Sequence, residues 1–139
     1  LAFDSGLTKG DWCPINTKTF ESKLVKNIHV IGDAAIATKM PKSGFSASSQ
    51  GKVVAMQIAR LLAKMPIMTP PKLANTCYSL LSPTYGISVA AVYEAHGDKI
   101  VKIEGSGGLS PMSASKEYRM QEAEYAIGWY QNQMADIFR

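Results

Sequence analysis

The hydrophobic pattern of the first half of the chain predicts one buried strand and one helix. The first 20 residues are polar and punctuated by glycine and proline, which favours turns. The run Asn27–Ile31 is β-branched and ends abruptly at Gly32-Asp33, as a buried strand does. From Ser46 to Lys64 large apolar side chains recur at helical spacing, and small residues crowd the first turns. Small side chains let backbones approach, so we expect this helix to begin against a neighbouring surface.

The second half predicts a small β-sheet followed by a long helix. Three runs have the composition of strands, at Thr76–Leu80, Gly86–Tyr93 and Lys99–Ile103, and residues 96–98 predict a hairpin between the last two. Residues Ser115–Phe138 predict an amphipathic helix. Its apolar positions share one face: Ala123, Ile127, Tyr130, Met134 and Ile137.

Prolines at positions 66, 70 and 71 predict a linker between the two halves. We therefore expect two domains, residues 1–65 and residues 72–139, and an α+β fold. The start of the chain has neither an initiator methionine nor the profile of a secretory signal, so we read it as a cut within a longer polypeptide or a processed terminus.

Composition narrows the possible functions. Apolar residues make up 46% of the chain and charged residues 19%, which is typical of a folded domain. The net charge is +4 and the basic residues are scattered, which argues against a nucleic-acid surface. No stretch approaches the roughly 20 apolar residues of a membrane span. Cys13 and Cys77 form no metal-ligand pattern, so we expect no metal site; buried thiols, a mutual disulfide or pairing with other cysteines all remain open.

The carboxylate that follows the predicted strand is the first candidate for ligand binding. Asp33 can accept hydrogen bonds from ribose or ribityl hydroxyls. The start of the next helix carries about half a positive charge, which favours the anion that forms on a reduced flavin. An aspartate that only caps a turn gives the same pattern, so Gly32-Asp33 alone leaves both interpretations open.

The wider sequence resembles a flavoprotein family. Residues 28–34 (IHVIGDA), 40–47 (MPKSGFSA) and Gln50-Gly51 resemble the second flavin-contacting motif of flavoproteins with two dinucleotide-binding domains. Residues 75–81 (NTCYSLL), 85–93 (YGISVAAVY) and Trp129-Tyr130 resemble the flavoprotein subunit of flavocytochrome c sulfide dehydrogenase. The resemblance runs from about Trp12 to the end of the chain.

This resemblance implies a fold and an activity. The fold would be the end of a dinucleotide-binding-type FAD domain, a strand plus a helix, followed by a flavin-binding interface domain with a small antiparallel sheet and a C-terminal amphipathic helix. The enzyme would oxidise sulfide to sulfur in the periplasm and pass electrons through FAD to a c-type cytochrome subunit. No Gly-x-Gly-x-x-Gly motif follows a strand here, so the N-terminal remainder of the polypeptide would supply the ADP-binding domain. We expect the isolated chain to be inactive and prone to self-association.

The resemblance also implies roles for individual residues. Gly32 and Asp33 would hold the ribityl chain. Cys77 would form a redox-active disulfide beside the flavin, and Trp129 would lie near the flavin and the sulfide site. Backbone N–H groups of the helix start would face the pyrimidine end of the isoalloxazine ring: Lys42, Ser43, Gly44, Phe45, Ser46 and Ala47. From the residues alone, a lone cysteine in a strand such as Cys77 is usually a small hydrophobe, and Trp129 is equally a packing residue.

Two other interpretations compete. A sulfide:quinone reductase would need an apolar or basic amphipathic C-terminal element for membrane docking. The last helix disfavours this because it has no basic face and carries Glu122, Glu124, Asp136 and Arg139. The second alternative is a non-catalytic module that caps a larger enzyme or binds a cytochrome.

Overall fold

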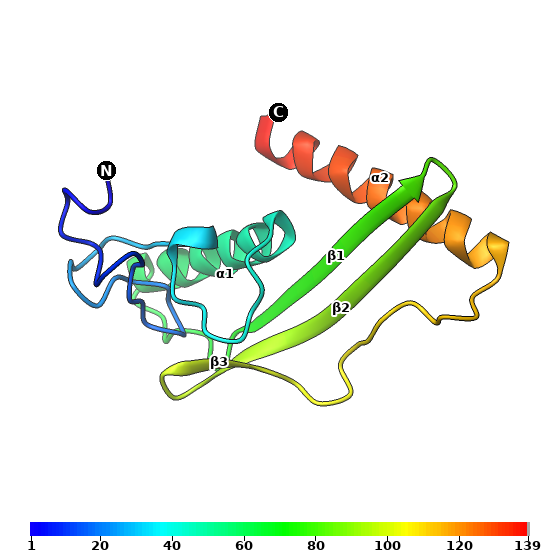
Figure 1. Ribbon diagram of the computed structural model, residues 1–139. Helices are drawn as coiled ribbons and strands as arrows, with labels where there is room; N and C mark the ends of the chain where they lie inside the picture. Colours follow the sequence, from blue (N-terminus) through cyan, green and yellow to red (C-terminus); the bar gives the residue numbers. More distant parts are fainter. Residues whose placement is uncertain (139) are drawn as a thin grey trace. The chain divides into compact units, whose positions relative to one another are not determined.

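The computed structural model describes residues 1–138 and has an α+β fold (Figure 1). Arg139, counted above among the charges of the last helix, lies outside the described residues. The predicted fold class is confirmed, as are three strands, the hairpin and both helices. The elements follow in the order η1 (Gly32–Ala34), α1 (Gly44–Leu62), β1 (Lys72–Ser82), β2 (Tyr85–His96), β3 (Lys99–Lys102) and α2 (Lys116–Phe138). Neither long helix in residues 1–138 combines the length and apolar character needed to cross a membrane.

The three strands form one sheet in the order β1-β2-β3. Strand β2 pairs antiparallel with β3, and the register places Tyr93 opposite Lys102 and His96 opposite Lys99. The connection consists of Gly97 and Asp98 and lies within residues 96–98, where the sequence predicts the hairpin. Gly97 has a positive φ of 57°, which a tight turn of this kind requires and glycine adopts without strain.

The chain forms two compact units. Unit 1 comprises Leu1–Asn75 and Val92–Glu104, and unit 2 comprises Thr76–Ala91 and the chain from Gly105 onward. Both long strands contribute residues to both units. The domain boundary expected between residues 65 and 72 stays a prediction.

Unit 1 is stabilised by a small apolar core and by hydrogen bonds of buried polar side chains. Phe20, Leu73 and Ile100 are fully or almost fully buried. Gln57 of α1 is also completely buried, and its amide nitrogen donates to the carbonyl oxygens of Lys18 at 2.9 Å and Met68 at 2.7 Å. A buried amide is tolerated where its donors and acceptors are paired, so Gln57 fixes α1 to the chain on both sides.

The prediction of a strand at Asn27–Ile31 was wrong. Only His29 forms an isolated bridge, to Glu21, and Ile28 and Ile31 stay 43% and 39% exposed. The backbone of this run bonds locally, with the Val30 amide donating to the Phe20 carbonyl at 2.9 Å. A strand exists only where another strand pairs along it, and among residues 1–138 none runs beside this segment.

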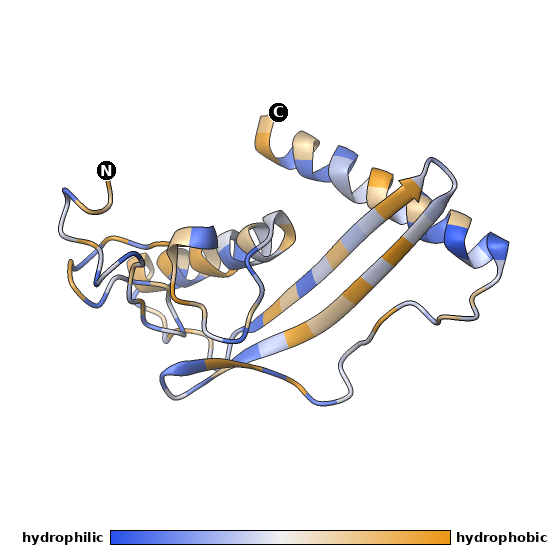
Figure 2. Cartoon of the chain, in the orientation of Figure 1, coloured by the Kyte–Doolittle hydropathy of each residue, from blue (hydrophilic) through white to orange (hydrophobic). Residues whose placement is uncertain are grey.

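Unit 2 packs α2 against the start of β2. A side chain at Gly86 of β2 would lie 2.6 Å from the Ala123 amide nitrogen, so glycine is needed for this backbone contact. The predicted apolar face of α2 is therefore only partly buried: Ala123 is fully covered, whereas Ile127 and Tyr130 are 43% and 59% exposed. Figure 2 shows the resulting mixture of hydrophobic and hydrophilic positions along β1, β2 and α2.

Candidate functional site

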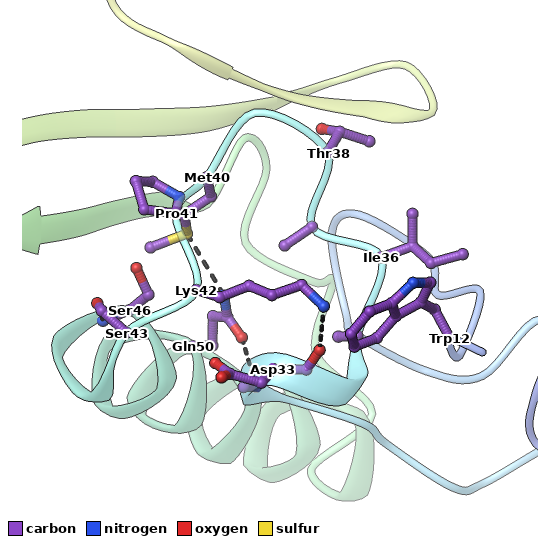
Figure 3. A pocket seen from close by; sticks show the side chains of 13 residues that line it. Trp12, Asp33, Ile36, Thr38, Met40, Pro41, Lys42, Ser43, Ser46 and Gln50 are labelled. Atoms are coloured by element: carbon purple, nitrogen blue, oxygen red, sulfur yellow. Dashed lines mark hydrogen bonds between the residues drawn. The ribbon is translucent and has the colours of Figure 1, made fainter.

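A hollow of about 140 Å³ lies in unit 1 beside η1 and the start of α1 (Figure 3). Its walls come from Trp12, from most of the segment 32–43, and from Ser46 and Gln50 of α1. The hollow therefore gathers side chains from three separate stretches of sequence. Its wall includes residues of the motif that predicts flavin binding.

The start of α1 is fixed by a serine at its N-cap. Ser43 has an extended backbone, and its hydroxyl oxygen accepts the Ser46 amide at 3.1 Å, as serine does at this position. The Ser43 and Ser46 hydroxyls both donate to the side-chain oxygen of Asn75, at 2.6 Å and 3.0 Å. The helix start is thus tied to β1, and its two serines border the hollow.

The turn that carries Asp33 is hydrogen-bonded to α1. The Gly32 amide donates to the side-chain oxygen of Gln50 at 2.7 Å, and Gln50 is only 1% exposed. Gly32 has a positive φ of 69°, and a Cβ there would lie 3.4 Å from the Ala47 methyl group. The positive φ favours glycine, because another residue would strain the backbone there, whereas the distance to Ala47 is that of an ordinary van der Waals contact.

Asp33 stands at the rim of the hollow with an exposed side chain. Within residues 1–138 its carboxylate takes part in neither a hydrogen bond nor an ion pair. The carboxylate is an acceptor with two oxygens, and both are available to ligand hydroxyls. This is the property that a polyol-binding residue needs.

A lysine supplies positive charge beside Asp33. The Lys42 ammonium lies over the Trp12 indole ring, 2.8 Å from its centroid, and donates to the backbone carbonyl oxygen of Asp33 at 2.6 Å (Figure 3). An ammonium over an indole face is attracted by the negative potential of the ring. The hollow therefore presents a hydrogen-bond acceptor and a cation to the same ligand.

The structure brings together five of the eight predicted flavin-binding residues. Those that line the hollow are Gly32, Asp33, Lys42, Ser43 and Ser46. Gly44, Phe45 and Ala47 belong to the first turns of α1 but are not part of the wall. Their proposed role uses backbone N–H groups and stays a prediction.

Sequence reasoning did not name eight of the residues that line the hollow as contacts, and Gln50 and Trp12 are among them. Gln50 follows Ser46 by four positions on a helix, so their shared face could have been recognised from spacing. No sequence pattern indicates that Trp12 lies at the hollow, since the turn-rich segment around it has no periodicity that would link it to Gly32. Its neighbour Cys13 reveals why it lies here: the Cys13 amide donates to the Ala34 carbonyl at 2.8 Å, next to η1.

The two predicted catalytic residues belong to unit 2. Cys77 lies on β1 and Trp129 on α2, and both side chains are partly exposed. The structure does not join Cys77 to Cys13, which is 1% exposed. Beside Cys77, burial raises the pKa of the Tyr78 phenol, and Glu122 and Tyr125 raise it further. The catalytic roles of Cys77 and Trp129 stay predictions.

Comparison with known families decides the class of protein. Residues 69–138 match the model of a family described as flavocytochrome c sulphide dehydrogenase, flavin-binding. The match covers half of the chain. The chain belongs to this family. The flavocytochrome c sulphide dehydrogenase family consists of flavin-binding oxidoreductases, and its name couples the flavin to a cytochrome c.

The matched range begins just before β1 and takes in the sheet and α2. The residues that line the hollow all precede this range in the sequence, so the ligand of the hollow is inferred from its chemistry. Its residues suit a flavin: an unpaired carboxylate for the polyol chain, a cation, and a capped helix start at one wall.

Proposed function

We propose that the chain forms part of an FAD-dependent sulfide dehydrogenase, which oxidises sulfide to sulfur and passes the electrons to a c-type cytochrome subunit. The family match over residues 69–138 carries this proposal. The hollow of unit 1 supports it, because its polar groups are those that a flavin nucleotide needs. The remainder of the polypeptide would provide the ADP-binding domain, and the complete protein would act in the periplasm.

In this proposal the residues of unit 1 bind and orient FAD. The Asp33 carboxylate accepts hydrogen bonds from ribityl or ribose hydroxyls. The Lys42 ammonium and the start of α1 supply positive potential at the ring. FAD, when bound, supplies the capacity to accept two electrons from sulfur, and the protein supplies placement.

The residues of unit 2 would serve the sulfur chemistry. Hydrosulfide attacks one sulfur of a disulfide between Cys77 and a partner cysteine elsewhere in the complete protein. A new sulfur–sulfur bond forms on the attacked cysteine, and the other cysteine leaves as a thiolate. Trp129 would form an aromatic wall of this site. Without the partner cysteine the chain alone is expected to be inactive.

Flavin binding is tested by titrating FAD with the purified chain and following flavin fluorescence to high protein concentration. We expect weak, saturable binding, which Asp33→Asn weakens about tenfold because a charged acceptor is lost. Asp98→Asn is the matched control, since it removes the same charge from the exposed β2–β3 hairpin. Equal affinity of the Asp33→Asn and Asp98→Asn variants would contradict the assignment.

The sulfur step is tested in the complete protein with its cytochrome subunit. Cys77→Ser is expected to abolish sulfide-dependent reduction of the cytochrome while FAD content is retained. Cys13→Ala, at a buried cysteine without a proposed redox role, is expected to keep the activity. Sulfide oxidation that survives Cys77→Ser would refute the proposed mechanism.

A further inference from the structure

The contact between Lys42 and Trp12 joins two segments that are far apart in the sequence. Lys42 precedes the N-cap of α1, whereas Trp12 comes from the turn-rich first segment. Both line the hollow, and Trp12 is 46% exposed. An exposed indole at a cavity wall leaves one of its faces accessible to a ligand or a side chain, and here the Lys42 ammonium occupies that position (Figure 3).

The charge of Lys42 is not neutralised by a carboxylate. Its two contacts in residues 1–138 are the indole ring and the Asp33 carbonyl oxygen, and it forms no ion pair among these residues. A lysine ammonium on a flexible stem samples many positions unless partners restrict it. The indole and the carbonyl together restrict it to the wall of the hollow.

Trp12 is itself held in place by backbone hydrogen bonds. The Lys9 amide donates to the Trp12 carbonyl at 2.9 Å. The next residue, Cys13, forms a parallel bridge with Ala35, and the Ile36 amide donates to the Cys13 carbonyl at 3.0 Å. The backbone at Trp12 is therefore anchored to the same loop that carries Asp33, which places the indole ring at the wall of the hollow.

We propose that Trp12 is a positioning residue, which holds the Lys42 ammonium as a fixed positive charge for a negatively charged group of the ligand. The identity of that group rests on the proposed function: it is the ring of reduced FAD, which carries a negative charge that the oxidised ring lacks. The pyrophosphate of FAD is also anionic but is present in both oxidation states. The ratio of affinities for reduced and oxidised FAD therefore distinguishes these two sources of charge.

The first test needs no flavin. Trp129→Phe leaves Trp12 as the single tryptophan, since the chain has two. In this background, quenching of Trp12 fluorescence by iodide reports nearby positive charge, and quenching by neutral acrylamide reports exposure alone. We expect Lys42→Met to lower the ratio of iodide to acrylamide quenching roughly twofold, as loss of a partly screened adjacent charge predicts. Lys39→Met removes the same charge from an exposed residue outside the hollow wall and should leave the ratio unchanged.

The second test measures the affinity of the chain for oxidised FAD and for dithionite-reduced FAD. Lys42→Met and Trp12→Leu are each expected to lower the reduced-to-oxidised ratio by a similar factor, roughly fivefold. Trp12→Phe keeps an aromatic face and should retain most of the preference. In the double variant the ratio should fall no further than in Lys42→Met alone, because both changes remove the effect of the same positioned ammonium.

Two results would overturn the proposal. One is an iodide ratio that Lys42→Met lowers no more than Lys39→Met does. The other is a set of losses that add up in the double variant, which would mean that Trp12 acts independently of Lys42. Absence of binding of either form of FAD would instead contradict the assignment of the hollow to flavin, and the iodide measurement would still decide whether the Lys42 charge is held at Trp12.

Discussion

The Ser43 hydroxyl lies 2.6 Å from the side-chain oxygen of Asn75 and at the same time caps the first turn of α1. One oxygen thus donates to β1 and accepts the Ser46 amide. The wall of the hollow and the start of the sheet are therefore fixed by the same residue. Loss of this hydroxyl should therefore destabilise both the start of α1 and the wall of the hollow.

Ser43→Ala is expected to lower the free energy of unfolding by about 1–2 kcal/mol, because an N-cap hydroxyl and a side-chain hydrogen bond are removed together. Urea denaturation followed by circular dichroism measures the change. Ser43→Thr keeps the hydroxyl and should stay near the wild type. An alanine variant as stable as the threonine variant would show that the cap is dispensable.

Gly86 is expected to tolerate no side chain. In Gly86→Ala the new methyl group meets the backbone of α2 at Ala123, which cannot yield as a flexible side chain would. We expect unit 2 to lose about 1–3 kcal/mol, which hydrogen exchange of the α2 amides would report.

Gly128 provides the control for Gly86. It lies within α2, and a Cβ there would meet nothing within 4 Å. Gly128→Ala should therefore slow exchange of the α2 amides, since alanine favours a helix over glycine by up to about 1 kcal/mol. Equal effects of the two substitutions would argue against the close contact between β2 and α2.

The two cysteines should differ in reactivity. Cys77 is partly exposed, whereas Cys13 is 1% exposed and packed beside η1. With a chromogenic disulfide reagent, we expect one fast reaction at Cys77 and a reaction of Cys13 at least about a hundredfold slower, because Cys13 must wait for local opening. Cys77→Ser should remove the fast phase, and Cys13→Ala should preserve it. A fast phase that persists in Cys77→Ser would mean that unit 1 opens readily around Cys13.

Tyr78 should make the chain less stable in alkali. Burial, and then the charge of Glu122 and the neighbouring Tyr125, raise the pKa of this phenol above its ordinary value of 10.0. The unfolded chain therefore releases the proton first. The contribution of Tyr78 to stability is complete below about pH 10 and is lost as the pH rises through the higher pKa of the folded state.

We therefore expect the fall in unfolding free energy above about pH 10 to be less steep in Tyr78→Phe than in the wild type. Tyr130→Phe, which removes the same hydroxyl from a residue that is 59% exposed, serves as the control. Urea denaturation across this pH range measures the slopes. Identical slopes for Tyr78→Phe and the wild type would contradict the predicted shift.

The sequence by itself determined the helices, the β2–β3 hairpin and the fold class, because side-chain periodicity and turn residues are local properties. It also singled out Gly32, Asp33 and Ser43, which line the hollow and stand in a continuous motif. It failed at Asn27–Ile31, since β-branched residues favour a strand only where another strand pairs with them.

Only the tertiary structure decided which side chains meet. Trp12 reaches Lys42 because the backbone of Cys13 pairs with Ala35, just after η1. No spacing of residues along the chain predicts that pairing. The buried face of α2 was likewise decided by its partner: the bare backbone at Gly86 admits Ala123 and leaves larger neighbours exposed. Local patterns specify elements, whereas contacts between distant segments depend on how those elements pack, and the hollow consists of such contacts.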